Sequence, residues 1–247
     1  MPGPHPGLTP DPTDPNWAAA AATALGCADC PVRDSAVCAV LSAEERLALS
    51  GIGRTVSLQS GQTLFDAGED ALACATLIEG SLKLSRLDED GTERLFAIVH
   101  PSGFLGRLFS AETDVTATAL TPARLCVFPR AAFEQVLADR PHLMRQILSR
   151  TMQALEESRA LVELIGRRSV KDRLCGFIAL SLHGQCAAPA DEEPVLDLPL
   201  DRRDLAALLG TTIETLSRQF GALEDEGTIR REGNRRIRIT DPAMLGL

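Results

Sequence analysis

The chain lacks two kinds of apolar segment. No stretch approaches the roughly 18 uninterrupted apolar residues of a membrane span. The first residues, MPGPHPGLTPDPTDPNW, have neither the basic start nor the apolar core of a secretion signal. Hydrophobic residues make up 45% and charged residues 24% of the sequence, which is typical of a folded protein and excludes a disordered or fibrous one. We therefore expect a folded cytoplasmic protein that has no contact with a membrane.

Recognisable catalytic motifs are also missing. The sequence contains no phosphate-binding G-x-x-x-x-G-K-S/T loop, no G-x-S-x-G nucleophile turn and no H-E-x-x-H zinc motif. It shows no Ser/His/Asp set, and its four histidines are isolated and form no ligand pair. The sequence therefore predicts a protein that is not an enzyme.

The length and the charge limit the possible architectures. With 247 residues and 26.4 kDa, the chain is long enough for two domains, because one core usually serves roughly 100–200 residues. The net charge of −9 and the pI near 5.0 argue by themselves against nucleic-acid binding. A few arginines gathered on one face can outweigh that average locally, so the distribution of charge matters more than its sum.

Cysteine is the most informative residue type. The seven cysteines are an odd number in a chain without an export signal, which argues against a disulfide framework and predicts reduced thiols. Cys27, Cys30 and Cys38 follow the spacing C-x2-C-x7-C, which brings sulfurs close enough to share a metal ion or a cluster. Free buried cysteines are the alternative. Zinc and a cubane cluster each need four ligands, so a fourth must come from elsewhere in the chain, which also holds Cys74, Cys126, Cys175 and Cys186.

The composition divides the chain into four segments. Residues 1–26 hold a proline-rich flexible tail and a short helix, and residues 27–140 hold the cysteine loop and a β-rich domain. Residues 141–168 hold a long helix, and residues 169–247 hold a small domain with helical and basic elements.

The β-rich domain is predicted from its periodicity. Between about residues 53 and 128, short and partly alternating apolar runs are separated by glycine and proline turns. Asp90-Gly91 lies between two such runs and is a strong hairpin signal. Before them, Ser42 and Glu45 form the capping-box pattern of a helix start. We expect an antiparallel β jelly-roll within an α+β chain.

A long helix is expected from Pro141 to about Ile165. Two adjacent apolar stripes run along it, so it can pack on its own domain and on a second copy of itself. One wide core stripe in a monomer is the alternative, and the pattern favours the dimer. The first stripe comprises Ile147, Thr151, Ala154, Ser158, Leu161 and Ile165, and the second comprises Leu148, Met152, Leu155, Arg159 and Val162.

The last segment contains a helix-turn-helix pattern. Residues 202–209 and 212–225 are expected to form helices joined by a turn at Gly210-Thr211, with Thr211 as the N-cap of the second helix. The basic run that follows predicts a β-hairpin wing whose arginines contact phosphates. A solvated charged edge is the alternative interpretation of this run. Its arginines are Arg230, Arg231, Arg235, Arg236 and Arg238.

The second of these helices carries residues suited to a DNA major groove. Glu214, Ser217 and Arg218 share one face at i, i+3 and i+4. Arginine donates two hydrogen bonds to guanine and glutamate accepts from cytosine, so the pair suits a G·C base pair. An ion pair between Glu214 and Arg218 is the alternative, and both can hold. With Thr211 and Thr212 at the helix start, these are the predicted DNA-binding residues.

The chain resembles the CRP/FNR superfamily of bacterial transcription regulators. The resemblance rests on the cysteine trio, a distant cysteine, the β domain, the long helix and an E-x-x-S-R helix-turn-helix. The chain is most similar to the oxygen-sensing FNR branch with the wider cysteine spacing, over about residues 27–240. The resemblance implies that one 4Fe-4S cluster is bound by four ligands. They are Cys27, Cys30, Cys38 and Cys126, with Cys74, in a core-like apolar run, as the rival fourth ligand.

The resemblance also implies partners. The E-x-x-S-R pattern of the FNR branch recognises a TTGAT-type half-site in an inverted repeat, which implies palindromic double-stranded DNA and a homodimer. The Asp88–Gly91 hairpin would contact RNA polymerase.

Cyclic-nucleotide-binding relatives use a Gly-Glu pair and a later Arg-Ser pair. Here Arg107 replaces the glutamate and TDVTAT replaces Arg-Ser, so no cyclic nucleotide is expected.

Together these features predict an oxygen-responsive regulator. Its cluster would promote dimerisation and DNA binding at low oxygen and be lost or converted in air. The alternative is a CRP/FNR-type regulator with a zinc site or a small-ligand effector and no oxygen-labile cluster.

Overall fold

The chain folds into two compact units, Met1–Leu155 and Glu156–Leu247. The division falls inside the long helix α3 (Pro141–Ile165), whose predicted start and end are confirmed. The predicted tail with its short helix, and Cys186, lie outside the described residues. This computed structural model describes residues 27–89, 91, 93–183, 193–233 and 235–245.

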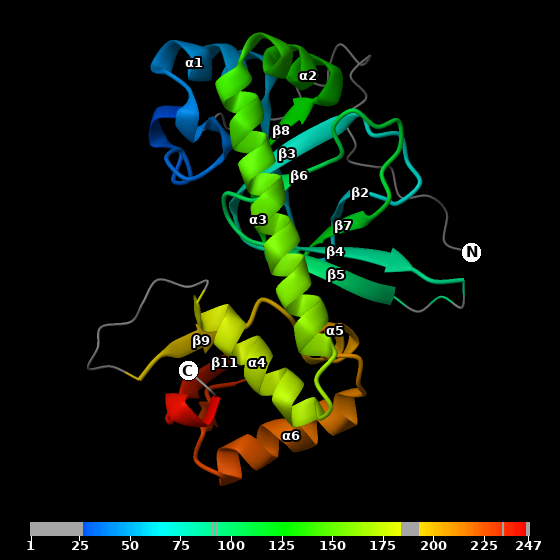
Figure 1. The fold of residues 1–247 in the computed structure, drawn as a ribbon, viewed down its shortest axis with the longest axis vertical. Coiled ribbons are helices and arrows are strands. Elements are labelled where there is room, and N and C mark those ends of the chain that lie inside the picture. The colour runs from blue at the N-terminus through cyan, green and yellow to red at the C-terminus, as the bar shows by residue number, and fades with distance from the viewer. Residues whose placement is uncertain (1–26, 90, 92, 184–192, 234, 246–247) are drawn as a thin grey trace. The chain divides into compact units, whose positions relative to one another are not determined.

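The first unit contains the predicted antiparallel β domain (Figure 1). Its two four-stranded sheets have the orders β1-β8-β3-β6 and β2-β7-β4-β5, and every pairing is antiparallel. The two-residue strand β6 has no counterpart among the predicted runs. The strands are β1 (Arg54–Leu58), β2 (Thr63–Phe65), β3 (Ala73–Glu79), β4 (Leu82–Leu87), β5 (Glu93–Val99), β6 (Phe104–Leu105), β7 (Thr116–Ala119) and β8 (Ala123–Pro129).

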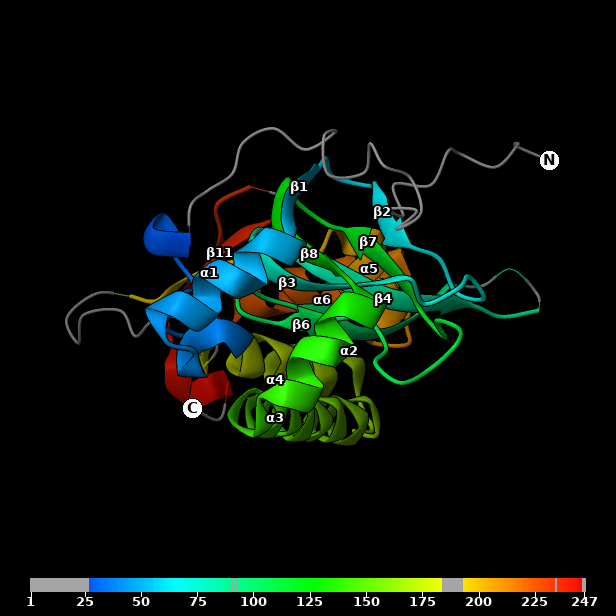
Figure 2. The same cartoon turned by 90° about the horizontal axis from the view of Figure 1, so that it is seen from above.

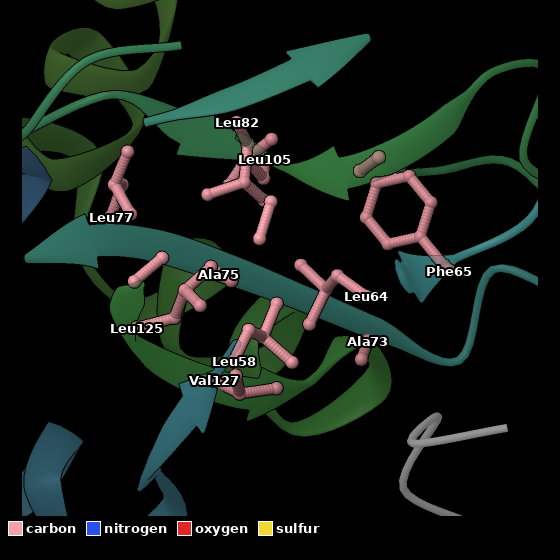
Figure 3. Close-up of a cluster of buried hydrophobic side chains, with 13 residues drawn as sticks. Leu58, Leu64, Phe65, Ala73, Ala75, Leu77, Leu82, Leu105, Leu125 and Val127 are labelled. Carbon is pink, nitrogen blue, oxygen red and sulfur yellow. The ribbon is translucent and has the colours of Figure 1, made fainter. Parts of the chain in front are cut away.

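The space between the two sheets is filled by apolar side chains. Figure 3 shows Leu77 and Leu125 from one sheet and Leu64, Phe65 and Leu82 from the other in a single cluster. Leu77, Leu82 and Leu125 are fully buried. Burial of such apolar area is the main favourable term in folding, so this cluster holds the sandwich together.

Two local predictions in the first unit are confirmed. Strands β4 and β5 form a hairpin around Gly91, whose φ of +79° favours glycine. Ser42 caps helix α1 (Ala43–Ile52), because its side chain accepts from the Glu45 amide while the Glu45 carboxylate accepts from the Ser42 amide.

Short helices precede and follow the sandwich. The two 3-10 turns η1 (Cys27–Asp29) and η2 (Val37–Val40) carry the cysteine loop into α1. After β8, the chain enters α2 (Arg130–Asp139) and then α3. Figures 1 and 2 show α1 and α2 side by side, and α2 contacts β3 and β8.

The second unit is a small winged helix-turn-helix domain. Helix α4 packs on α6, and α5 also contacts α6. A three-stranded antiparallel sheet of order β10-β11-β9 completes the unit. Its elements are α4 (Val170–His183), β9 (Val195–Asp197), α5 (Arg202–Leu208), α6 (Ile213–Asp225), β10 (Ile229–Arg231), β11 (Arg236–Ile239) and the 3-10 turn η3 (Pro242–Leu245).

Candidate functional site

Four cysteines from two distant parts of the sequence line one cavity. Cys27, Cys30 and Cys38 come from the cysteine loop (residues 27–41), and Cys126 comes from the middle of β8. The cavity has a volume of about 50 Å³, which exceeds the ~10–15 Å³ that one water molecule needs. These are the four residues predicted as ligands, and the fold brings all of them to one place.

The cysteine loop is shaped by its own hydrogen bonds and by burial. The Arg33 amide donates to the Cys30 carbonyl at 3.1 Å, and the Ala36 amide donates to the Val32 carbonyl at 2.8 Å. Val32 and Ala36 are buried together with Ile78 of β3, and Cys30, Cys38 and Cys126 pack against them. The loop is therefore anchored on the outer face of the β1-β8-β3-β6 sheet by a small apolar cluster.

Cys126 is flanked by a threonine on each neighbouring strand. Its direct cross-strand partners are Thr55 on β1 and Thr76 on β3, and both line the cavity. Thr76 is 4% exposed, and its Oγ1 has no hydrogen-bond partner among the described residues. The sequence interpretation did not single out these threonines. The available signal was one polar residue inside the apolar run of β3.

The rival cysteine, Cys74, occupies a different environment. It is 1% exposed, does not line the cavity, and packs in a core with Phe128, Phe133 and Leu143. Its predicted core character is thus confirmed, and the placement of the cavity favours Cys126 as the fourth ligand.

Burial favours the neutral form of two cavity thiols, Cys126 and Cys38, by raising the pKa of each. It raises the pKa of Cys126 to about 12, and the neighbouring Cys27, Cys38 and Cys30 add to this increase. Burial, then Cys30 and Cys27, raise the pKa of Cys38. The neighbouring thiols thus disfavour ionisation of Cys38 and Cys126, and a positive metal centre would have to replace their protons before several thiolates share this space.

The candidate ligands of the cavity are the sulfur atoms of four cysteines. Among the described residues, no three His, Cys, Asp or Glu side chains approach closely enough to hold one metal ion. The four thiolates of a cluster bind different iron atoms and therefore stand farther apart than the ligands of one zinc ion. The donor set is all sulfur and the surroundings are apolar, which fits an iron–sulfur cluster.

The cysteine loop packs directly on the start of α3. Val37 and Leu41 share one buried core with Leu143 and Ile147. The Glu45 carboxylate lies 3.5 Å from the Arg140 guanidinium and 3.3 Å from the His142 imidazole. The cysteine loop and α1 thus share packing and ion pairs with the start of α3 and the residue before it.

One apolar stripe of α3 remains exposed. Leu148, Met152 and Leu155 are 60%, 48% and 41% exposed in the single chain, and Val162 continues the stripe. Ile147, on the adjacent stripe, is buried in the first unit. Farther along that adjacent stripe, Thr151, Ala154, Ser158 and Ile165 are exposed, so the single chain buries only its first residue.

The helix-turn-helix differs from the prediction at its N-cap. Thr212, and not Thr211, caps α6, because its Oγ1 accepts from the Thr215 amide at 3.2 Å. Thr211 still belongs to the end of α5: its amide donates to the Ala206 carbonyl at 2.9 Å, next to Gly210 at φ +60°. This C-terminal capping motif of α5 needs a glycine in the left-handed region. Because Thr211 belongs to it, the next helix starts one residue later than predicted.

The predicted base-contacting face of α6 is open. Glu214, Ser217 and Arg218 are exposed, whereas Leu216 and Phe220 on the opposite face are fully buried. Among the described ion pairs, none joins Glu214 to Arg218. Arg218 Nη2 instead donates to Thr215 Oγ1 at 3.2 Å.

The wing arginines divide into two groups. Arg231 pairs with Glu224, while Arg236 and Arg238 pair with Glu232 at 3.3 and 2.7 Å. Arg230 and Arg235 are exposed and have no ion pair within the described part of the chain. The hairpin is confirmed, and only these two arginines present uncompensated charge for a phosphate.

The β-sandwich also holds a cluster of charged side chains. It lies in the segment where cyclic-nucleotide-binding relatives have their Gly-Glu and Arg-Ser pairs. Arg107 and Arg86 lie 3.4 and 3.7 Å from the Asp114 carboxylate. The sequence analysis named Arg107 here but no cation suited to a cyclic phosphate, and the structure adds Arg86. Both are neutralised by a carboxylate of the chain itself.

Comparisons with known proteins agree with this geometry. Residues 55–140 match the cyclic nucleotide-binding domain family, and residues 172–246 match the Crp-like helix-turn-helix domain family. The chain is 34% identical over 222 residues to the transcriptional activator protein FnrL of Cereibacter sphaeroides, covering 89% of this chain and 90% of FnrL. The chain belongs to the CRP/FNR family. This CRP/FNR protein is therefore a DNA-binding transcription regulator of the FNR/FixK type, and not an enzyme.

A second relative supports this membership, and a solved structure shows the same fold. The regulator is 34% identical over 203 residues to the nitrogen fixation regulation protein FixK of Bradyrhizobium diazoefficiens, covering 82% of this chain and 85% of FixK. The solved structure of FixK2 from Bradyrhizobium japonicum superposes with a TM-score of 0.71, covering 79% of this chain and 96% of that one, at 21% identity. The described helices include none that is long and apolar enough to span a membrane.

Proposed function

We propose that this CRP/FNR regulator responds to oxygen through a 4Fe-4S cluster held by Cys27, Cys30, Cys38 and Cys126. The observation that carries the proposal is the convergence of these four thiols, from residues up to 99 positions apart, on one cavity. Cys74 and Cys175 are also described, and neither lines it.

The donor set favours a cluster over the zinc alternative. A structural zinc site closes four ligands around one ion, and the described side chains offer no such group of three. A bound cluster would supply an oxygen-labile link between the cysteine loop and β8. The chain itself supplies the surroundings, with Val37, Ile78 and Phe128 among the apolar residues that limit access of water.

The cysteine loop is coupled to dimerisation through packing. Val37 and Leu41 contact the same core as Leu143 and Ile147, and the exposed stripe of α3 begins one residue later, at Leu148. An anchored loop holds the first turns of α3 in place, whereas a loosened loop releases them. The free-energy difference between these two states sets how far oxygen shifts the monomer–dimer equilibrium.

The homodimer binds an inverted repeat of TTGAT-type half-sites. Glu214 and Arg218 of each recognition helix address a G·C pair, while Arg230 and Arg235 supply charge for phosphates. The net charge of −9 confines binding to this face, so affinity falls steeply with salt.

RNA polymerase is the further partner. FnrL is named a transcriptional activator, and we extend activation to this chain. The contact would use the β4–β5 hairpin, where the Gly91 amide donates to the Asp88 carbonyl at 2.9 Å and Arg94 pairs with Asp88.

The decisive experiment is anaerobic purification followed by exposure to air. We expect visible iron–sulfur absorption, about four iron atoms and four sulfides per chain, and specific binding to a TTGAT palindrome. All three should decline together in air. Colourless, iron-free protein that still dimerises and binds the palindrome would overturn the proposal, and stoichiometric zinc would establish the alternative.

A matched pair of cysteine variants makes this experiment specific. Cys175 lies on α4 in the second unit and does not line the cavity. Cys175→Ser should retain the absorption and the oxygen response, whereas Cys38→Ser should lose both. Equal behaviour of the two variants would contradict the assignment of the cavity.

A further inference from the structure

The hydroxyl group of Thr76 is an unusual feature of the cavity wall. Thr76 lies within β3, where six consecutive residues are buried, and it is 4% exposed. The residue lines the cavity, and its buried Oγ1 finds no hydrogen-bond partner among the described residues. A buried hydroxyl without a partner is destabilising, so its presence calls for an acceptor that the protein part lacks.

The position of Thr76 indicates which acceptor is missing. Its direct partner across the β3–β8 pairing is Cys126, and side chains of such pairs stand next to one another on the same face. The cavity that both residues line also receives Cys27, Cys30 and Cys38. A cluster bound there would therefore be surrounded by sulfur atoms, and the cysteine thiolates that hold it would carry negative charge.

We propose that the Thr76 hydroxyl donates a hydrogen bond to a sulfur atom of the group held in this cavity, and so sets its redox behaviour. This inference rests on the proposed cluster function and assigns Thr76 a positioning and tuning role. Hydrogen bonds to the sulfurs are one of the means by which proteins set cluster potentials.

The direction of the effect follows from electrostatics. An added electron increases the negative charge on the sulfurs, so a donor stabilises the reduced form more than the oxidised form. Loss of the donor lowers the midpoint potential and makes the cluster easier to oxidise. Without the cluster, the same hydroxyl has no acceptor, so its removal should stabilise the cluster-free protein. The proposal thus predicts opposite signs for the two forms.

The test compares Thr76→Val, which keeps the shape and removes the hydroxyl, with Thr76→Ser, which keeps the hydroxyl. Anaerobic, cluster-loaded Thr76→Val should have a midpoint potential lower by about 59 mV, a tenfold change for a one-electron couple. Its visible absorption should decay several-fold faster in air. Cluster-free Thr76→Val should melt about 2–4 °C higher than the wild type. Thr76→Ser should match the wild type in potential and decay.

Thr228 provides a matched control. It is also fully buried with an unpartnered Oγ1, but it precedes β10 in the second unit and does not line the cavity. Thr228→Val should raise the melting temperature of both forms without changing the potential or the decay in air.

The outcomes separate this inference from the proposed function. Wild-type protein without iron–sulfur absorption overturns both. A wild-type cluster combined with an unchanged potential and lifetime in Thr76→Val, at equal iron content, overturns the Thr76 inference and leaves the cluster function standing. An unchanged melting temperature of cluster-free Thr76→Val also counts against it, because the hydroxyl then has another partner.

Discussion

The hydroxyl oxygens of Ser35 and Ser102 lie 2.5 Å apart although 67 residues separate them in sequence. Ser35 belongs to the cysteine loop, and Ser102 lies in the turn between β5 and β6, where it adopts an unusual φ of +76°. The hydrogen bond therefore connects the cysteine loop to the β-sandwich independently of any metal.

Removal of this bond should loosen the loop. In cluster-free Ser35→Ala, we expect amide hydrogens of residues 30–41 to exchange faster by up to about fivefold, equivalent to ~1 kcal/mol for one net hydrogen bond. Hydrogen exchange with mass spectrometry measures this directly. Ser57→Ala, at an exposed position of β1, is the control. Equal exchange in the two variants would show that the Ser35–Ser102 contact does not restrain the loop.

The fourth ligand can be tested by comparing Cys126→Ser with Cys74→Ser. Cys126 lines the cavity and Cys74 does not, so Cys126→Ser should abolish anaerobic iron binding and visible absorption. Cys74→Ser places a polar group in an apolar core, which should lower the unfolding free energy by ~1–3 kcal/mol while the cluster remains. A cluster that survives in Cys126→Ser but is lost in folded Cys74→Ser would reverse the assignment.

Base recognition depends on an arginine that is oriented within its own helix. Arg218→Ala should reduce discrimination for the G·C pair by ~1–3 kcal/mol. Thr215→Val, which removes the 3.2 Å contact to Arg218, should cause a smaller loss. Titrations against operators with single base changes measure both. Arg235→Ala should weaken binding to all sequences alike and lower the salt slope by about one, as expected for a phosphate contact. Unchanged preference in Arg218→Ala would exclude its base contact.

Dimerisation should depend on the exposed stripe of α3. Leu148→Glu puts a charge on a surface that a second copy would bury, so the dimer should weaken by about 3 kcal/mol, roughly a hundredfold in Kd. Sedimentation of the anaerobic protein at several concentrations gives this constant. Gln153→Glu changes charge on a different face of the same helix and should leave it nearly unchanged. A dimer that tolerates Leu148→Glu but not Gln153→Glu would place the interface elsewhere.

The stability of the cluster-free protein should depend on alkaline pH. Burial raises the pKa of Cys126 from 9.0 to about 12, so folding favours the neutral thiol. Below pH 9 the folded and unfolded states both hold this proton. Above it, the unfolded chain ionises first, and the unfolding free energy declines until about pH 12. Denaturant titrations under reducing conditions should show a shallower decline for Cys126→Ser, and parallel declines would contradict the burial of this thiol.

Much of the architecture could be predicted from local patterns. The β-strand runs, the long helix and the helix-turn-helix follow from hydrophobic periodicity, and the Ser42–Glu45 capping box follows from a four-residue motif. The error at Thr211 arose because Thr211 still belongs to the end of α5, where its amide donates to the Ala206 carbonyl after Gly210 at positive φ, so that Thr212 caps α6.

The sequence by itself determined the cysteine trio, the exposed face of α6 and the double stripe of α3, because each depends on spacings of a few residues along one element. Only the tertiary structure decided which distant cysteine faces the trio, which wing arginines stay uncompensated, and that Thr76 stands beside Cys126. These relationships depend on strand register and on contacts between segments far apart in the chain. A shift of one residue in register would turn the Cys126 side chain to the other face of the sheet.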